Sequence, residues 1–139
     1  MIVIDVNVIV YLLSETPQRE SARQVYERDS DWLVPPLWRH EMLNVLATLT
    51  RQDVLDVSSA LTVWRNALGL LEMREQQPDM ENALALAVDH RISAYDAQYV
   101  ELATSLGVLL VSEDKKLQRL FPKMVFSLAK MGCAGEVAR

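Results

Sequence analysis

The sequence predicts an α/β protein in which a parallel β-sheet is covered by helices on both faces. Short aliphatic runs recur along the chain, and the first of them, Ile2–Ile4, has no polar residue, as expected for a strand that is buried on both sides. Longer segments with helical periodicity separate these runs, which favours parallel strands joined by crossover helices. The chain has 139 residues, of which 50% are hydrophobic, so it is long enough to form the core of one domain.

The expected strands are short and end at recognisable positions. Pro35 and Pro36 stop the run that begins at Asp31, because proline has no backbone N–H for the sheet. The clearest strand after the first is the apolar run "VLLV", whereas "LLEMRE" and "KMVF" are weaker candidates. In chain order, strands are predicted over residues 2–4, 31–36, 70–75, 108–111 and 123–126.

The segments between the strands have helical periodicity and recognisable end signals. Thr16 suits the N-cap of one helix, with Pro17 in its first position. Gly69 is expected to end another helix, and Ser93 and Gly107 mark the two ends of a third. Helices are predicted over residues 6–13, 16–28, 37–51, 51–68, 78–90, 93–107 and 112–121.

Residues 1–126 are predicted to form one domain, since no linker, repeat or low-complexity segment interrupts them. Residues 127–139 carry little periodicity and are predicted to form a mobile C-terminal tail. A single cysteine, Cys133, excludes an intramolecular disulfide and a thiol-rich metal site, which favours a reducing compartment.

The charge and the apolar segments narrow the class of partner. The chain shows no signal peptide, and the run "LGVLLV" is too short to cross a bilayer, so we expect a cytoplasmic protein without membrane contact. The formal net charge of −5 argues against a general polyanion binder. A nucleic-acid partner would therefore need local basic clusters or bound cations.

Four carboxylates occupy positions that a parallel sheet can bring together, namely Asp5, Glu41, Asp96 and Asp114. Each also has a simpler explanation. Asp5 follows the first strand and suits a ligand and a helix N-cap equally well. Asp96, three residues after Ser93, matches a capping box, and Asp114 suits the first turn of a helix; for each of these alone, the cap is the better explanation. Glu41 lies at the border of an apolar helix face, where a glutamate is usually solvated.

The joint arrangement of these residues favours a common site. Asp5 and Asp114 follow the two clearest strands, and Asp96 begins a helix that leads into one of them, so all can lie along one sheet edge. Two like charges ~4 Å apart, at an effective dielectric constant of about 20, repel by roughly 4 kcal/mol, equivalent to about three pKa units. A divalent cation removes this repulsion, and an all-oxygen site suits Mg²⁺ or Mn²⁺ better than Zn²⁺. Such an ion can activate water and stabilise a phosphoryl oxygen, which is the chemistry of phosphodiester cleavage.

Other catalytic chemistries find no support in the sequence. His40 is expected on the polar side of its helix and His90 near a helix end, so both are interpreted as surface residues rather than as a zinc pair. The chain has four glycines and neither a G-x-S-x-G nor a GxxxxGK[ST] motif. Serine-nucleophile and phosphate-loop mechanisms are therefore not predicted.

Four ordered stretches carry a further signal: "IVIDVNVIV", "PPLWRHEMLNVL", "SAYDAQYVELA" and "LLVSEDKKL". Together they resemble the PIN-domain family, and within it the VapC-type ribonuclease toxins of toxin–antitoxin pairs. The resemblance extends from residue 1 to about 126. It implies a three-layer α/β/α fold with a central parallel sheet, an acidic site for Mg²⁺ or Mn²⁺, and hydrolysis of RNA.

Motif matching places the catalytic set of that family on the same four carboxylates. The resemblance implies that Asp5 and Asp96 hold the metal ion most directly and that Asp114 supports it directly or through water. It also implies that Glu41 orients the metal or the attacking water. Glu113, directly before Asp114, is unusual for the family. Four further polar residues match positions beside the site: Asn7, Asn44, Ser93 and Ser112.

The resemblance also implies partners. These are an RNA substrate, a small VapB-like antitoxin whose segment blocks the acidic groove, and a second copy of the chain in a homodimer. Lys115, Lys116 and Arg119 either contact the RNA backbone or form a solvated basic face. Two alternatives are an inactive PIN scaffold for RNA or protein interaction and a receiver-like phosphoacceptor domain. The second would need paired acids near the first strand, where "IVIDVN" has one.

Overall fold

The computed structural model describes residues 1–137, which contain a four-stranded parallel sheet. The strands are β1 (Ile2–Ile4), β2 (Trp32–Leu33), β3 (Leu110–Val111) and β4 (Val125–Phe126). Their order is β2-β1-β3-β4, so the first strand lies inside the sheet rather than at its edge. Parallel pairing sets Val3 opposite both Leu33 and Leu110. The strand predicted over 2–4 is confirmed with the same bounds, and those predicted over 31–36, 108–111 and 123–126 are confirmed in shortened form.

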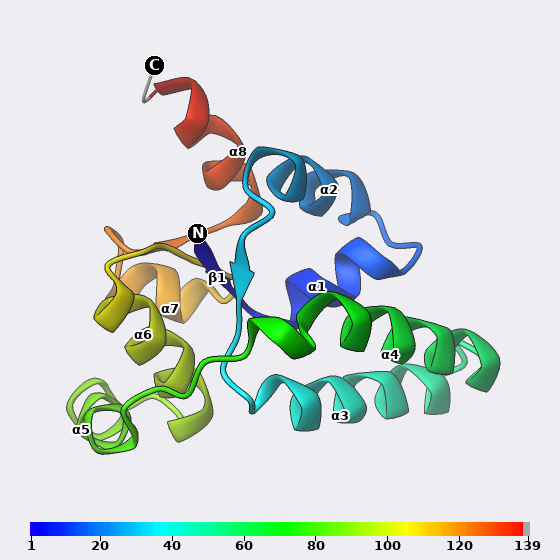
Figure 1. The fold of residues 1–139 in the computed structure, drawn as a ribbon, viewed down its shortest axis with the longest axis horizontal. Coiled ribbons are helices and arrows are strands. Elements are labelled where there is room, and N and C mark those ends of the chain that lie inside the picture. The colour runs from blue at the N-terminus through cyan, green and yellow to red at the C-terminus, as the bar shows by residue number, and fades with distance from the viewer. Residues whose placement is uncertain (138–139) are drawn as a thin grey trace.

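Helices fill the connections between the strands. They are α1 (Val6–Leu13), α2 (Arg19–Arg28), α3 (Trp38–Arg51), α4 (Val57–Leu71), α5 (Met80–His90), α6 (Ala94–Leu106), α7 (Lys115–Leu120) and α8 (Leu128–Val137), with a short 3₁₀ helix, η1 (Glu72–Arg74), directly after α4. In Figure 1, α3 and α4 lie side by side, and α5 and α6 pack together on the other side of β1. No helix in the described range 1–137 combines the length and the hydropathy that a membrane span requires.

Successive residues of β1 enter different parts of the core. Ile2 and Ile4 pack with residues of α1, α3 and α4, among them Trp38. Val3 packs with residues of α6 and α7, among them Tyr99. All three β1 side chains are buried, as expected for a central strand with helices on both faces. The predicted α/β fold with a central parallel sheet is thus confirmed.

The strand order creates a topological switch point beside β1. From β1 the chain goes to β2 on one side and then crosses to β3 on the other. In open α/β sheets, ligands bind outside the carboxyl ends of the strands at such a point. Asp5 follows β1 there, and its backbone N–H donates to the Val111 carbonyl of β3 at 3.1 Å. The fold therefore places Asp5 where a ligand site is expected.

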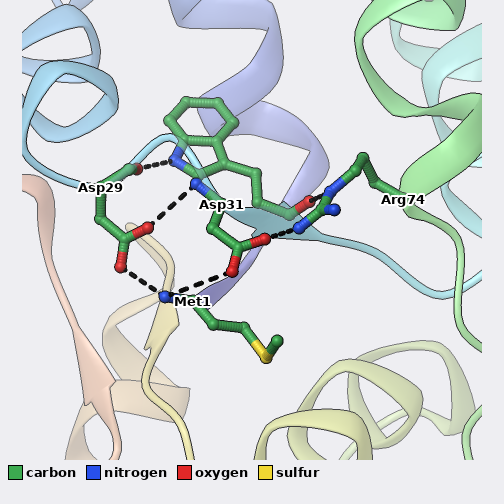
Figure 2. A network of polar contacts seen from close by, with 5 residues as sticks. Met1, Asp29, Asp31 and Arg74 are labelled. Atoms are coloured by element: carbon green, nitrogen blue, oxygen red, sulfur yellow. Dashed lines mark hydrogen bonds and ion pairs between the residues drawn. The ribbon is translucent and has the colours of Figure 1, made fainter.

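Ion pairs hold the amino end of β1 (Figure 2). This end is opposite the one that leads into Asp5. The ammonium group of Met1 lies 2.7 Å from Asp29 Oδ2 and 3.8 Å from Asp31 Oδ2. Arg74 pairs with Asp31 and donates from Nε to the Trp32 carbonyl at 3.2 Å. These contacts join the amino ends of β1 and β2 to η1 and so fix the position of the central strand.

The start of α2 differs from the prediction. The helix begins at Arg19 with Gln18 at its N-cap, so Thr16 does not cap it and Pro17 is not its first residue. The Arg19 N–H donates instead to the Thr16 carbonyl at 3.1 Å, which closes a turn ahead of the helix. Proline and threonine thus form the turn that leads into α2 rather than its first turn.

The helix expected over 51–68 is shifted toward the C-terminus. It begins at Val57, where the Asp56 side chain accepts the Ser59 N–H at 2.7 Å as an N-cap. It also continues through Gly69 to Leu71, which is fully buried. Burying a leucine contributes about 1.5–3 kcal/mol, more than the roughly 1 kcal/mol that glycine costs inside a helix.

The strand predicted over 70–75 is wrong. Residues 70 and 71 end α4, and Glu72–Arg74 form η1. Glu75 makes a single parallel bridge to Val34, outside the named strands. The helical packing of Leu71 in the core therefore prevails over the weak strand signal of this segment.

Residues 128–137 form a helix, although this part of the sequence shows little periodicity and lies in the expected tail. α8 packs against α2, and Leu128 is buried in the core. The Glu113 carboxylate accepts the Leu128 N–H at 2.6 Å and so satisfies a backbone donor at the start of the helix. Residues 138–139 of the expected tail lie outside the described residues.

Candidate active site

The structure brings the four predicted carboxylates to one cavity of about 380 Å³. Asp5 follows β1, Glu41 belongs to α3, Asp96 to α6, and Asp114 directly precedes α7. Each carboxylate therefore comes from a different part of the fold. The cavity is lined by Asp5, Val6, Asn7, Tyr11, Glu41, Asn44, Val45, Asp96, Glu113 and Asp114.

Asp5 occupies the N-cap position of α1, but its carboxylate makes no capping hydrogen bond. The fully buried Ser112 donates from its hydroxyl to Asp5 Oδ2 at 2.9 Å. Burial raises the pKa of Asp5, the hydrogen bond from Ser112 opposes this, and the negative charge of Asp96 raises the pKa further. The nearby amides of Val6 and Asn7 lower it in smaller measure. The carboxylate therefore contacts Ser112 and lines the cavity instead of capping α1.

Glu41 is partly buried in the cavity wall, so the simpler explanation of a solvated surface residue does not apply to it. The Tyr99 hydroxyl on α6 donates to Glu41 Oε1 at 2.7 Å. Burial raises the pKa of Glu41, the Tyr99 hydrogen bond opposes the rise, and the charges of Asp5 and Asp96 add to it. Because α3 buries its apolar face, including Trp38, a residue at the border of that face reaches the cavity instead of open solvent.

Asp96 and Asp114 combine helix capping with a place in the cavity wall. Ser93 Oγ accepts the Asp96 N–H at 3.0 Å, which confirms Ser93 as the N-cap of α6. Asp114 Oδ1 accepts the Leu117 N–H at 2.9 Å as the N-cap of α7. Burial raises the pKa of Asp96, and the charge of Asp114 raises it further. Capping engages one oxygen of Asp114, so it leaves the carboxylate able to act in the cavity as well.

Glu113 lines the same cavity but has a different neighbour. Its Oε1 accepts the Leu128 N–H, so this carboxylate links the cavity to α8. Burial raises the pKa of Tyr11, and the charge of Glu113 is the next cause. Asp114 rather than Glu113 raises the pKa of Asp96. Of the two adjacent acids, Asp114 is therefore the one whose charge acts on Asp96.

The lining of the cavity is acidic. Within the described chain, none of its lining residues is a lysine, arginine or histidine. Carboxylate and amide oxygens are the ligands that Mg²⁺ and Mn²⁺ prefer, so the donor set fits a hard divalent cation. Among residues 1–137, however, no three acidic, histidine or cysteine side chains are grouped closely enough to hold an ion as they stand. The chemistry of the donors fits a metal, whereas their positions are not those of an assembled metal site.

Comparison with known proteins identifies the fold family. A family model of the PIN domain matches residues 2–121. The chain belongs to the PIN-domain family. This PIN domain is similar to "Ribonuclease VapC3" of Pyrobaculum aerophilum, with 27% identity over 127 residues that cover 89% of this chain and 97% of the relative. It is also similar to "Ribonuclease VapC3" of Mycobacterium tuberculosis, with 30% identity over 126 residues, or 87% of this chain and 88% of the relative.

Solved structures show the same fold as this PIN domain. PAE2754 from Pyrobaculum aerophilum superposes with a TM-score of 0.77 at 19% identity, covering 99% of this chain and 97% of the other. FitAcB from Neisseria gonorrhoeae gives a TM-score of 0.69 at 19% identity, covering 93% of this chain and 99% of the other. At this level of identity, the likeness concerns the fold alone.

Two tyrosines of the PIN domain's site are missing from the sequence prediction. Tyr11 lies one turn after Asn7 on α1 and lines the cavity. Tyr99 lies three residues after Asp96 on α6 and is only 3% exposed. Residues three or four apart share a helix face, so their spacing from the motif residues is the signal that would have found them.

The polar residues implied by the resemblance have different roles. Asn7 and Asn44 line the cavity, where their amides add to its polar surface. Ser112 holds Asp5, whereas Ser93 caps α6. Both histidines of the chain lie outside the cavity lining.

The basic residues predicted beside the site are exposed around α7. Lys116 Nζ donates to the Arg91 carbonyl at 2.8 Å, and its charge lowers the pKa of Asp96. Lys115 and Arg119 are exposed on the same short helix. None of these three lysine and arginine residues lines the cavity, so they would contact a ligand outside it.

We expect the acidic cavity to destabilise the metal-free PIN domain at neutral pH. The pKa values of Asp5, Glu41 and Asp96 are raised, so the folded protein binds protons more tightly there than the unfolded chain does. Their contribution to the free energy of unfolding is thus unfavourable above the raised pKa values. This unfavourable contribution disappears as the pH falls through the raised pKa values to about 4, the ordinary pKa of such carboxylates.

Asp5→Asn isolates this effect from that of the other carboxylates. In EDTA, the variant should be more stable than the wild type at pH 7, and its advantage should shrink as the pH approaches about 4. Urea unfolding of both proteins across this range measures the difference. An advantage that does not vary with pH would contradict the expectation.

Proposed function

We propose that this PIN domain is a magnesium-dependent endoribonuclease and the toxin of a toxin–antitoxin pair. The observation that carries the proposal is the convergence of four carboxylates, from separate elements, on one cavity that no basic side chain of the described residues lines. The two relatives named Ribonuclease VapC3, which align along most of the chain, support RNA as the substrate. An all-oxygen donor set supports Mg²⁺, with Mn²⁺ as a possible replacement.

In the proposed mechanism, Asp5 and Asp96 would hold the ion most directly, and Asp114 would support it directly or through water. A bound ion would lower the pKa of a coordinated water and stabilise charge on the phosphoryl oxygens. Ser112 keeps Asp5 oriented through its hydrogen bond to Oδ2. Glu41 would orient the attacking water through Oε2, since Oε1 accepts the hydrogen bond from Tyr99.

RNA binding is proposed to depend on local groups, since the net charge of −5 provides little long-range attraction for a polyanion. Lys115 and Arg119 are exposed beside the site and suited to contact phosphates. Asn7 and Asn44 offer amide groups to the nucleotides at the cavity. RNA binding through these groups is therefore expected to weaken as the salt concentration rises and to be weak without the divalent ion.

The direct test is cleavage of single-stranded and structured RNA by the purified protein over a Mg²⁺ series, with EDTA as the control. Sequencing the new RNA ends gives the cleavage positions. RNA binding without cleavage at any Mg²⁺ or Mn²⁺ concentration would favour the inactive scaffold instead. Transfer of phosphate from a small phosphodonor to Asp5 would favour the receiver-like alternative.

An antitoxin segment that carries an arginine should inhibit the proposed nuclease by occupying the acidic cavity. A guanidinium group can form charge-assisted, bidentate hydrogen bonds with carboxylates, and five carboxylates but no basic side chain of the described residues line the cavity. We expect the product of a neighbouring gene to inhibit RNA cleavage. Excess Mg²⁺, or replacement of that arginine by alanine, should relieve the inhibition.

The measurement is a cleavage rate with and without the partner across the Mg²⁺ series. A partner variant in which a lysine elsewhere is changed to alanine is the control. Cleavage that is indifferent to every candidate partner would remove the toxin assignment and leave the nuclease.

A homodimer is also proposed, and an exposed apolar row on α5 supports it. Met80, Leu84 and Val88 recur every four residues and are 51%, 63% and 69% exposed. In a two-fold dimer, the same row can pack against its copy. The mass of the purified protein in solution decides between dimer and monomer.

A further inference from the structure

The hydrogen bond between Tyr99 and Glu41 joins two layers of the molecule at the cavity. Glu41 belongs to α3, which packs on α1 and α4. Tyr99 belongs to α6, which packs on α5, β1 and β3. The Tyr99 hydroxyl lies 2.7 Å from Glu41 Oε1. A group on α6 therefore holds a carboxylate that belongs to α3.

Tyr99 is packed in the core behind the cavity wall. The residue is 3% exposed and packs in the core cluster that contains Val3 and Leu110. It is not part of the cavity lining, so it is not placed to touch a substrate. Burial, followed by the negative charge of Glu41, raises the pKa of Tyr99 well above its ordinary value. The phenol therefore stays protonated and remains a hydrogen-bond donor.

We propose that Tyr99 is a positioning residue that fixes Oε1 of Glu41 and so directs Oε2 toward the attacking water. This inference rests on the proposed nuclease function. Tyr99 itself carries no charge and transfers no proton; its effect is on the conformation of Glu41.

The need for such a restraint follows from the charges around Glu41. Asp5 and Asp96 are the negative charges that act on Glu41, and like charges favour a rotation of its side chain away from them. A glutamate has several rotatable bonds, so without a partner it populates several rotamers. A charge-assisted hydrogen bond from a buried, rigid phenol opposes both effects.

Tyr99→Phe removes the hydroxyl and keeps the ring. We expect kcat for RNA cleavage to fall by roughly tenfold or more, while KM and the Kd for Mn²⁺ measured by calorimetry stay within about twofold. Thermal unfolding establishes that the variant is folded at the assay temperature. Tyr26→Phe is the matched control, because Tyr26 packs edge-on against Trp32 and lies outside the cavity lining.

A double-mutant cycle shows whether Tyr99 acts through Glu41. In a Glu41→Gln background, Tyr99→Phe should reduce cleavage much less than it does in the wild type. An equal loss in both backgrounds would overturn the inference. So would a lowered melting temperature with an unchanged kcat, since that is the result expected of a purely structural tie between α3 and α6.

The outcomes separate this inference from the function on which it rests. A wild-type protein that cleaves no RNA with Mg²⁺ or Mn²⁺ would overturn both. A wild type that cleaves, together with a Tyr99→Phe variant of equal kcat, would overturn only the role of Tyr99. If Tyr99→Phe does not fold, Glu41→Asp tests the same bond, because the shorter side chain keeps its charge but withdraws from the phenol. An unchanged kcat for Glu41→Asp would then be the contradicting result.

Discussion

Asp5→Asn should lower Mg²⁺-dependent RNA cleavage by more than about 100-fold, because even groups that only support metal ligands cost roughly 10–100-fold when removed. Asp5 follows the central strand, receives the Ser112 hydroxyl and lines the cavity, so no other described residue duplicates its position. The amide of asparagine can still accept the Ser112 hydrogen bond, so we expect the fold to remain intact. Asp96→Asn should have a similar effect for the same reason.

Metal binding provides a second measurement of the Asp5 prediction. A ligand that binds only the folded state at about 100 times its Kd adds about 2.7 kcal/mol to the free energy of unfolding. Mg²⁺ should therefore raise the melting temperature of the wild type and have little effect on Asp5→Asn. Asp89→Asn is the matched control, because Asp89 is exposed on α5 outside the cavity. Equal Mg²⁺ shifts in the wild type and Asp5→Asn would exclude Asp5 as a ligand.

Glu41→Gln should reduce cleavage by roughly 100-fold or more, the range in which positioned acid–base groups contribute. The substitution removes the charge that orients water but keeps an oxygen that can accept the hydrogen bond from Tyr99. A loss of activity without a lowered melting temperature would therefore report on chemistry rather than on folding. Full activity in this variant would return Glu41 to the role of a structural side chain.

The control for Glu41 has to be a glutamate on the surface. Glu20→Gln is suitable, because Glu20 is exposed and pairs with Arg23 on α2. Such surface changes usually alter stability by about half a kcal/mol or less. Glu101 is unsuitable, because it is only 3% exposed and its Oε2 accepts the Asp79 N–H at 2.9 Å. A substitution of Glu101 would remove this hydrogen bond at the start of α5, so it would not test the loss of a charge alone.

The sequence by itself determined the elements that depend on local patterns. The unbroken apolar run Ile2–Ile4 predicted a central strand, and it is paired on both sides. Ser93 and Gly107 predicted both ends of α6, because the serine hydroxyl accepts a backbone N–H and Gly107 adopts a φ of 67°. The four ordered motifs also identified the PIN family and named the carboxylates that the structure brings to one cavity.

Long-range packing decided what local patterns left open. Single-residue preferences predicted the end of α4 at Gly69, but the burial of Leu71 extended the helix. The little-patterned segment after Phe126 forms α8, because α2 and the Glu113 carboxylate supply contacts from distant parts of the chain. The spacing of residues along the chain predicted neither the contact of α8 with α2 nor the hydrogen bond from the Leu128 N–H to Glu113.

The same reason explains what the sequence missed at the site. Glu41 alone resembled a solvated residue at the border of a helix face, and its interaction with Tyr99 spans 58 positions of the chain. The Ser112 hydroxyl reaches Asp5 across 107 positions. Motifs could name the acidic residues because each belongs to a local pattern, but only the packing of α3 and α6 against the sheet determines which group holds each carboxylate. Hydrogen bonds and charges act over a few ångströms in space, whatever the separation along the chain.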